Sequence, residues 1–140
     1  MGSLHHVAQL GQANALDALR AVFMAHIDFV QEHPGVPRLV FQELQHARPT
    51  PLKEKVQQLM ADYRGLVSSL LAKAHQEALI APGVDRQSAV VLFMGAVQGL
   101  VMQSLVTGTL KDMRSQGQAV FNIYQAGLLA PETSEPRKFK

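Results

Sequence analysis

Histidines and carboxylates are the residues of this sequence that could bind a metal ion or transfer a proton. Two of the six histidines, His26 and His33, fall on one predicted helix, but they are seven positions apart, about 10.5 Å along the helix, too far to share one ion. Because tetrahedral zinc needs clustered ligands, we predict no metal site and no cofactor. Glu43 and His46 lie three residues apart, a spacing more typical of a surface hydrogen bond than of an acid–base pair.

Sequence motifs of the common enzyme classes are not found. There is no glycine-rich phosphate loop, no G-x-S-x-G elbow and no H-E-x-x-H helix. The sequence has no cysteine, which excludes disulfides and thiolate chemistry and favours the cytosol. A net charge of +2 does not indicate a nucleic-acid partner, and the N-terminus lacks the pattern of a signal peptide. We therefore expect a cytoplasmic protein that is not an enzyme.

Apolar residues recur with helical spacing throughout, and no segment alternates with the period of a strand. With 140 residues, 47% of them hydrophobic, the chain has the composition of one globular domain. Thr50 and Asp85 are suited to cap the starts of two helices, and Pro34-Gly35 ends an earlier one. The sequence predicts an all-α antiparallel bundle of about five helices, over residues 15–33, 38–46, 51–81, 85–108 and from about 112 or 115 to 129.

The helix over residues 85–108 is apolar on nearly every side. Its length approaches a membrane span of roughly 20 residues. However, Gln98, Gln103 and Ser104 interrupt it, and the other helices have the charged faces of an aqueous bundle, so we expect no membrane. One of its faces is bulky and suits the core of its own chain: Val90, Met94, Val97, Gln98, Val101 and Leu105.

The opposite face of this helix carries small or mildly polar residues, which let a second helix approach closely. We predict a homodimer in which the last two helices of each chain form a four-helix interface around a two-fold axis. A monomer with one central buried helix is the alternative. The predicted interface comprises Leu92, Gly95, Ala96, Gly99, Gln103 and Thr107, with Phe121, Tyr124 and Leu128 on the last helix.

Several short motifs resemble a known family. They are F-x-x-x-H-P-G-x-P-R-L-V-F-x-E-L (29–44), a long helix containing Tyr63, A-P-G-V-D-R-Q-S-A (81–89) and F-M-G-A-V-Q-G-L (93–100). Their order resembles the C-terminal half of tetracycline-repressor-type (TetR) transcriptional regulators over residues 14–130. This resemblance implies a helical domain that binds a small effector, dimerises through its last two helices and controls an N-terminal DNA-binding head.

An effector pocket in such a domain should be lined by apolar and aromatic side chains with a few polar groups, which favours a hydrophobic or aromatic ligand. Methionines can adapt to different ligands, and His26, Tyr63 and Gln98 would supply the polar groups. The predicted ligand-binding residues are Phe23, His26, Ile27, Val30, Phe41, Met60, Tyr63, Val67, Met94, Gln98 and Met102.

The sequence departs from the family pattern at its N-terminus. A helix-turn-helix head needs about 45 to 50 residues ahead of Leu16, whereas this chain has fifteen, so we expect it not to bind operator DNA by itself. Residues 1–13 are consistent with a cloning scar and the end of a connecting helix, residues 14–130 with the effector-binding and dimerisation domain, and residues 131–140 with a polar, basic tail. The alternative function is a freestanding homodimeric protein-interaction module without a small-molecule pocket.

Overall fold

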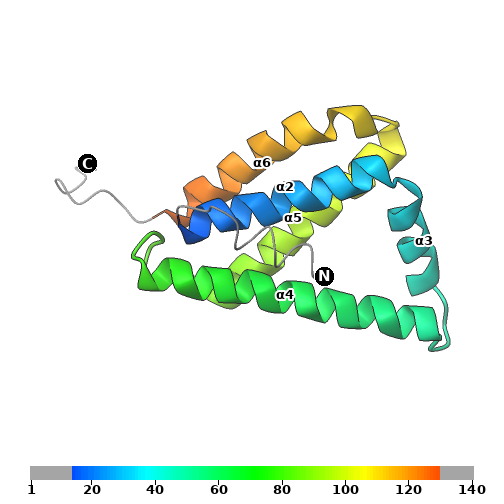
Figure 1. Ribbon diagram of the computed structural model, residues 1–140, viewed down its shortest axis with the longest axis horizontal. Helices are drawn as coiled ribbons and strands as arrows, with labels where there is room; N and C mark the ends of the chain where they lie inside the picture. Colours follow the sequence, from blue (N-terminus) through cyan, green and yellow to red (C-terminus); the bar gives the residue numbers. More distant parts are fainter. Residues whose placement is uncertain (1–13, 130–140) are drawn as a thin grey trace, which may run out of the picture.

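A computed structural model describes residues 14–129 as an all-α bundle (Figure 1), which confirms the predicted fold class. The predictions for residues 1–13 and 131–140 lie outside the described residues. Within residues 14–129 the extended structure is limited to one isolated bridge between Ile80 and Leu129. The elements are α2 (Ala15–Glu32), α3 (Gly35–Leu44), α4 (Pro51–Gln76), α5 (Arg86–Thr107), the 3-10 turn η1 (Leu110–Asp112) and α6 (Met113–Leu128).

Side-chain caps fix where three of the helices begin. Asn14 caps α2, and the predicted caps Thr50 and Asp85 accept hydrogen bonds from backbone N–H groups in the first turns of α4 and α5. Gly108 ends α5 in the left-handed conformation, with φ of 72°, which glycine adopts without strain. The ends of α5 therefore follow from local sequence.

Two boundaries differ from the predicted ones. Helix α3 begins at Gly35 rather than near Arg38, because Pro37 is tolerated in a first helical turn, where its missing N–H has no partner to lose. Helix α4 ends at Gln76 rather than near Ala81. Ala78 reverses the chain with φ of 58°, a conformation that ends helices and usually requires glycine.

Helices α2 and α5 each pack against several other helices of the bundle (Figure 1). Helix α2 packs along α6 and also against α4, while α5 packs against α4, α6 and α2. Helix α3 stands across one end of the bundle and joins the C-terminal end of α2 to the start of α4. Only Pro37 of α3 is buried. The bundle is therefore well packed along α2, α5 and α6 and loosely packed at α3.

An aromatic cluster occupies the centre of the core. The ring of Phe23 lies 5.4 Å from those of both Phe93 and Phe121, and the Phe93 ring packs edge-on against Tyr63 and Tyr124. The Tyr124 hydroxyl donates a 2.7 Å hydrogen bond to the carbonyl oxygen of Ala89. This cluster joins α2, α4, α5 and α6 around Phe93.

Polar contacts and one close approach tie α2 to α6. The Arg20 guanidinium donates hydrogen bonds to Gln118 and Asn122, and Asp28 forms an ion pair with Arg114. A Cβ added to Gly117 would lie 2.4 Å from Cδ1 of Ile27, so glycine lets these two helices approach closely.

By length and composition, α5 could cross a membrane. In the most apolar 18-residue stretch of α5, 44% of the residues are buried in the bundle. The outward surface of α5 is nevertheless apolar, since Val91, Leu92 and Val106 are 68%, 58% and 77% exposed. This helix therefore has one side in the core and a second apolar side that residues 14–129 leave exposed.

Candidate functional site

The most distinctive polar feature of the interior is a hydrogen-bonded pair that joins α2 to α4. Nδ1 of His26 lies 2.9 Å from the hydroxyl oxygen of Tyr63, and the ring centroids are 5.2 Å apart. Burial lowers the pKa of His26 to about 4 and raises the pKa of Tyr63 above its ordinary value. Both side chains are therefore uncharged at neutral pH.

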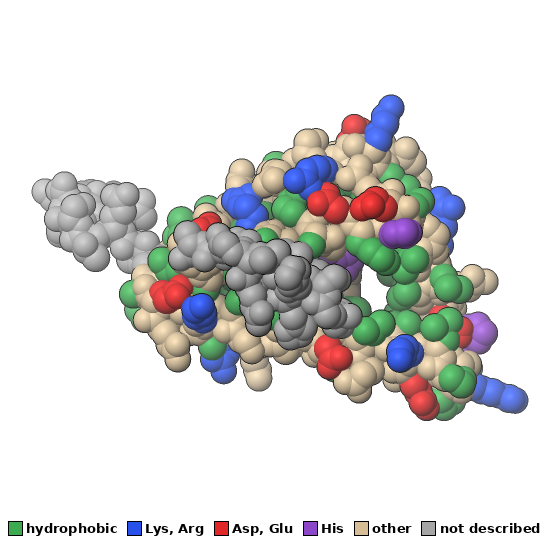
Figure 2. Space-filling view, in the orientation of Figure 1, with side chains coloured by type: hydrophobic (Ala, Val, Ile, Leu, Met, Phe, Trp, Pro, Cys, Tyr) green, Lys and Arg blue, Asp and Glu red, His purple; other side chains and the backbone are tan. Residues whose placement is uncertain are grey.

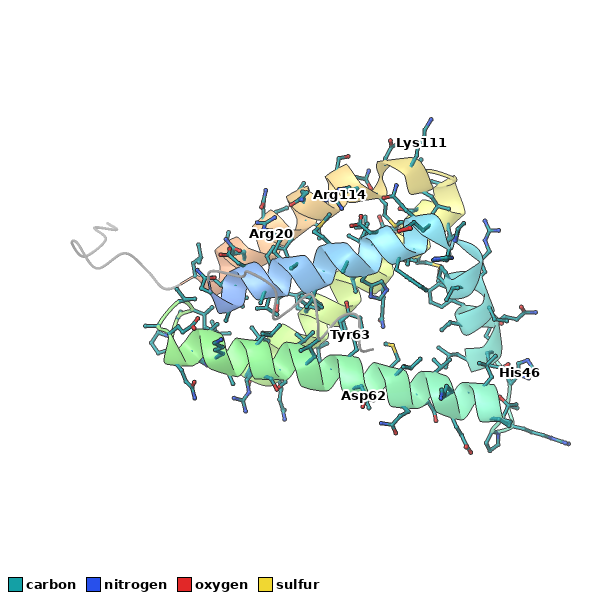
Figure 3. The ribbon with its side chains drawn as sticks, in the orientation of Figure 1. Arg20, His46, Asp62, Tyr63, Lys111 and Arg114 are labelled. Carbon is teal, nitrogen blue, oxygen red and sulfur yellow. The ribbon has the colours of Figure 1, made fainter. Side chains whose placement is uncertain are left out.

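An opening lies beside this pair. The space-filling view shows it between α2, α3 and α4, with hydrophobic side chains along much of its rim (Figure 2). Figure 3 shows Tyr63 on the side of α4 that faces α2. Val56, Met60 and Tyr63 recur on one face of α4 toward this region, and Phe41 of α3 is half-buried.

The predicted ligand-binding residues differ in how deeply they are buried. Phe23, Ile27 and Val67 are fully buried and belong to the core. His26 and Tyr63 are brought into direct contact. Phe41, Met60 and Gln98 are half-buried, whereas Met102 is 42% exposed. Val30 and Met94 are buried, at 3% and 6% exposure.

Sequence reasoning missed three residues of this region. Pro37 is the buried residue of α3, Val56 continues the apolar face of α4, and Phe93 packs on the Tyr63 ring. The spacing of Val56, Met60 and Tyr63, at intervals of four and three residues, was a signal for the α4 face. Nothing comparable in the sequence indicated Pro37, whose position depends on how α3 folds back.

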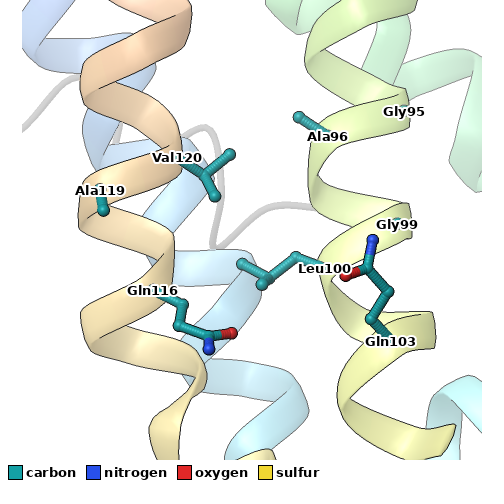
Figure 4. Close-up of a pocket in the computed structure, with 8 residues that line it drawn as sticks. All are labelled: Gly95, Ala96, Gly99, Leu100, Gln103, Gln116, Ala119 and Val120. Carbon is teal, nitrogen blue, oxygen red and sulfur yellow. The ribbon is translucent and has the colours of Figure 1, made fainter.

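A second candidate site is a groove of about 480 Å³ between α5 and α6 (Figure 4). Four of the predicted interface residues, Gly95, Ala96, Gly99 and Gln103, line it from α5, and Leu92 and Thr107 are exposed on the same helix. The full lining is Gly95, Ala96, Gly99, Leu100, Gln103, Gln116, Ala119 and Val120.

The α6 side of this groove differs from the residues predicted for it. Phe121, Tyr124 and Leu128 are buried in the core of their own chain, at 0%, 5% and 5% exposure. The surface of α6 that continues the groove carries Val120 and Ile123, and Ile123 is 76% exposed. The outward face of α6 therefore carries smaller side chains than its buried face.

Metal ligands do not cluster in the part of the chain that the structure describes. Within residues 14–129 no group of three or more histidine, aspartate or glutamate side chains lies close enough to hold an ion.

Two solved structures have a similar fold. The structure of FadR from Bacillus subtilis in complex with stearoyl-CoA superimposes with a TM-score of 0.78 at 16% identity, over 91% of this chain and 67% of that one. The fatty acid degradation regulator FadR from Bacillus halodurans gives the same TM-score and coverage at 15% identity. No curated protein sequence matches the chain.

The family assignment rests on the sequence itself. Residues 15–120 match the family described as tetracyclin repressor-like, C-terminal domain. The chain therefore belongs to this family, and the resemblance seen in its short motifs is confirmed.

Proposed function

We propose that this chain is the effector-sensing and dimerisation domain of a TetR-type regulator, and that a small, mostly apolar ligand binds between α2, α3 and α4. The observation that carries the proposal is the opening beside the His26–Tyr63 pair, with α3 loosely packed at its edge. The FadR structure from Bacillus subtilis supports it, because that protein, which has a similar fold, is in complex with stearoyl-CoA, whose acyl chain is apolar.

Dimerisation is the second part of the proposal. The outward surfaces of α5 and α6 combine small residues, which allow helices to approach closely, with exposed apolar side chains such as Leu92 and Ile123. A second copy of the chain would cover both helices with its own α5 and α6. The groove between them would then be closed by the partner.

Ligand binding would control the regulator through a change in population. A ligand shifts the balance between two helix arrangements only if it binds one of them more tightly. The loosely packed α3 is the element that can change position at the lowest cost. Control of DNA binding by an N-terminal head would belong to the full-length regulator.

Thermal-shift measurements with a set of apolar small molecules test the effector site. A ligand present at about one hundred times its Kd stabilises the folded state by about 2.7 kcal/mol, which raises the Tm by several degrees. Met60→Lys, which places a charge in the opening, should abolish the shift. Leu39→Lys, on exposed α3 surface, is the matched control and should retain it. An interaction module without a pocket would show no shift with any compound.

A further inference from the structure

The His26–Tyr63 pair retains hydrogen-bonding capacity that no other residue within 14–129 uses. Nδ1 of His26 contacts the Tyr63 hydroxyl, while Nε2 makes no hydrogen bond with another described residue. If Tyr63 donates to Nδ1, then Nε2 carries the ring proton and can donate. If Nδ1 donates to Tyr63, the phenol O–H of Tyr63 remains able to donate. In both tautomers the pair offers one donor.

The charged residues closest in sequence to the pair lie away from it. Asp28 pairs with Arg114 on α6, Asp62 accepts a hydrogen bond from Gln58 on its own helix, and Arg64 is exposed. Burial is the cause of the shifted pKa values of His26 and Tyr63, with no compensating charge beside them. The environment of the pair is therefore apolar and uncharged.

An ionised ligand group would be poorly accommodated there. A carboxylate beside the pair would either remain an unpaired charge in an apolar site or require protonation of His26 well above its pKa of about 4. A neutral carbonyl, ester or hydroxyl oxygen accepts the same hydrogen bond without either cost.

We infer that His26 and Tyr63 together anchor the effector by donating one hydrogen bond to a neutral oxygen atom on an otherwise apolar molecule, and that they disfavour a free carboxylate. This inference rests on the proposed effector site and adds the chemical class of its ligand. The apolar body of the ligand would lie along Val56, Met60 and Phe41.

Three ligands of matched chain length test the anchor, each measured by displacement of the neutral fluorescent dye N-phenyl-naphthylamine at neutral pH. Methyl octanoate has a neutral acceptor, chlorooctane lacks a strong acceptor, and octanoate is charged. We expect methyl octanoate to bind about three- to tenfold more tightly than chlorooctane, as one hydrogen bond allows. Octanoate should bind at least about tenfold more weakly than its methyl ester.

Two variants separate anchoring from a purely structural role. The double variant His26→Leu/Tyr63→Phe removes both polar groups and should bind methyl octanoate and chlorooctane equally. Tyr124→Phe removes a different buried hydroxyl, the one bonded to Ala89, and should keep the preference for the ester. A structural role of the pair would weaken all ligands in the double variant without changing their ratio.

Three results would overturn the inference. If octanoate binds as tightly as its ester, or if the double variant keeps the preference for the ester, the anchor is refuted while the effector site stands. If the wild-type protein binds neither the dye nor any of the three ligands, the anchor and the proposed effector site fail together.

Discussion

Nδ1 of His26 and the hydroxyl oxygen of Tyr63 lie 2.9 Å apart and form a polar link between α2 and α4. The link requires an uncharged imidazole if Tyr63 is to donate to Nδ1, and burial favours that uncharged form. The same contact therefore couples the stability of the fold to pH.

Acid should weaken the fold through His26. Its pKa is about 4 in the folded protein and 6.5 in the unfolded chain, so the unfolded chain takes up the proton first as the pH falls. The contribution of His26 to the free energy of unfolding is fully present above pH 6.5. It falls by roughly 3 kcal/mol as the pH is lowered to about 4. Urea unfolding across this range measures the loss. His26→Phe should reduce the pH dependence of the free energy of unfolding in this range. His46→Gln, at an exposed position, should leave it unchanged.

Gly117→Ala should destabilise the protein by about 1 to 3 kcal/mol, because the new methyl group would overlap the buried Ile27 side chain. Gly127→Ala, where the added carbon meets open space, should be neutral or stabilising. Ile27→Val deletes the Cδ1 atom that clashes, so combining it with Gly117→Ala should recover part of the loss. Equal destabilisation by the two glycine changes would contradict the close packing of α2 on α6.

Ala78→Gly should raise the free energy of unfolding by about 0.5 to 1 kcal/mol, since glycine adopts the left-handed conformation after α4 without the strain that Ala78 bears. Ala61→Gly, at an exposed position inside α4, should instead lower it by about 0.5 to 1 kcal/mol. Chemical unfolding of the two variants in parallel gives the comparison. A loss of stability in both would argue against a left-handed residue 78.

Leu92→Glu and Ile123→Glu should convert a dimer into monomers, because each puts a charge into the face formed by α5 and α6. Light scattering coupled to gel filtration should give twice the 15.3 kDa chain mass for the wild type and the single-chain mass for both variants. Leu39→Glu, on exposed α3, is the control and should remain dimeric. A wild-type particle of 15.3 kDa at micromolar concentration would refute the homodimer.

Local chemistry made much of the fold predictable. Helix α5 begins after Asp85 and ends at Gly108 because a capping carboxylate and a left-handed glycine act within one turn. The end of α4 was missed because Ala78 adopts a conformation that its residue type does not favour. Such a reversal is imposed by tertiary contacts, here those that pair Ile80 with Leu129.

The candidate sites were less predictable than the helices. Periodicity shows which residues of a helix share a face, but not whether that face meets its own chain or a partner. Phe121 and Tyr124 belong to the predicted interface, but the structure buries them around Phe93. The pairing of His26 with Tyr63 depends on the crossing of α2 and α4, which no local pattern encodes.

Pro37 is the single buried residue of α3, so this helix is held mainly by its connections to α2 and α4. Its backbone amide protons should exchange with deuterated solvent faster than those of α2 or α5, whose interior faces are covered along their length. Helix α3, one wall of the opening, would then open locally while the rest of the bundle stays folded. Local opening provides a route for a molecule to enter without global unfolding.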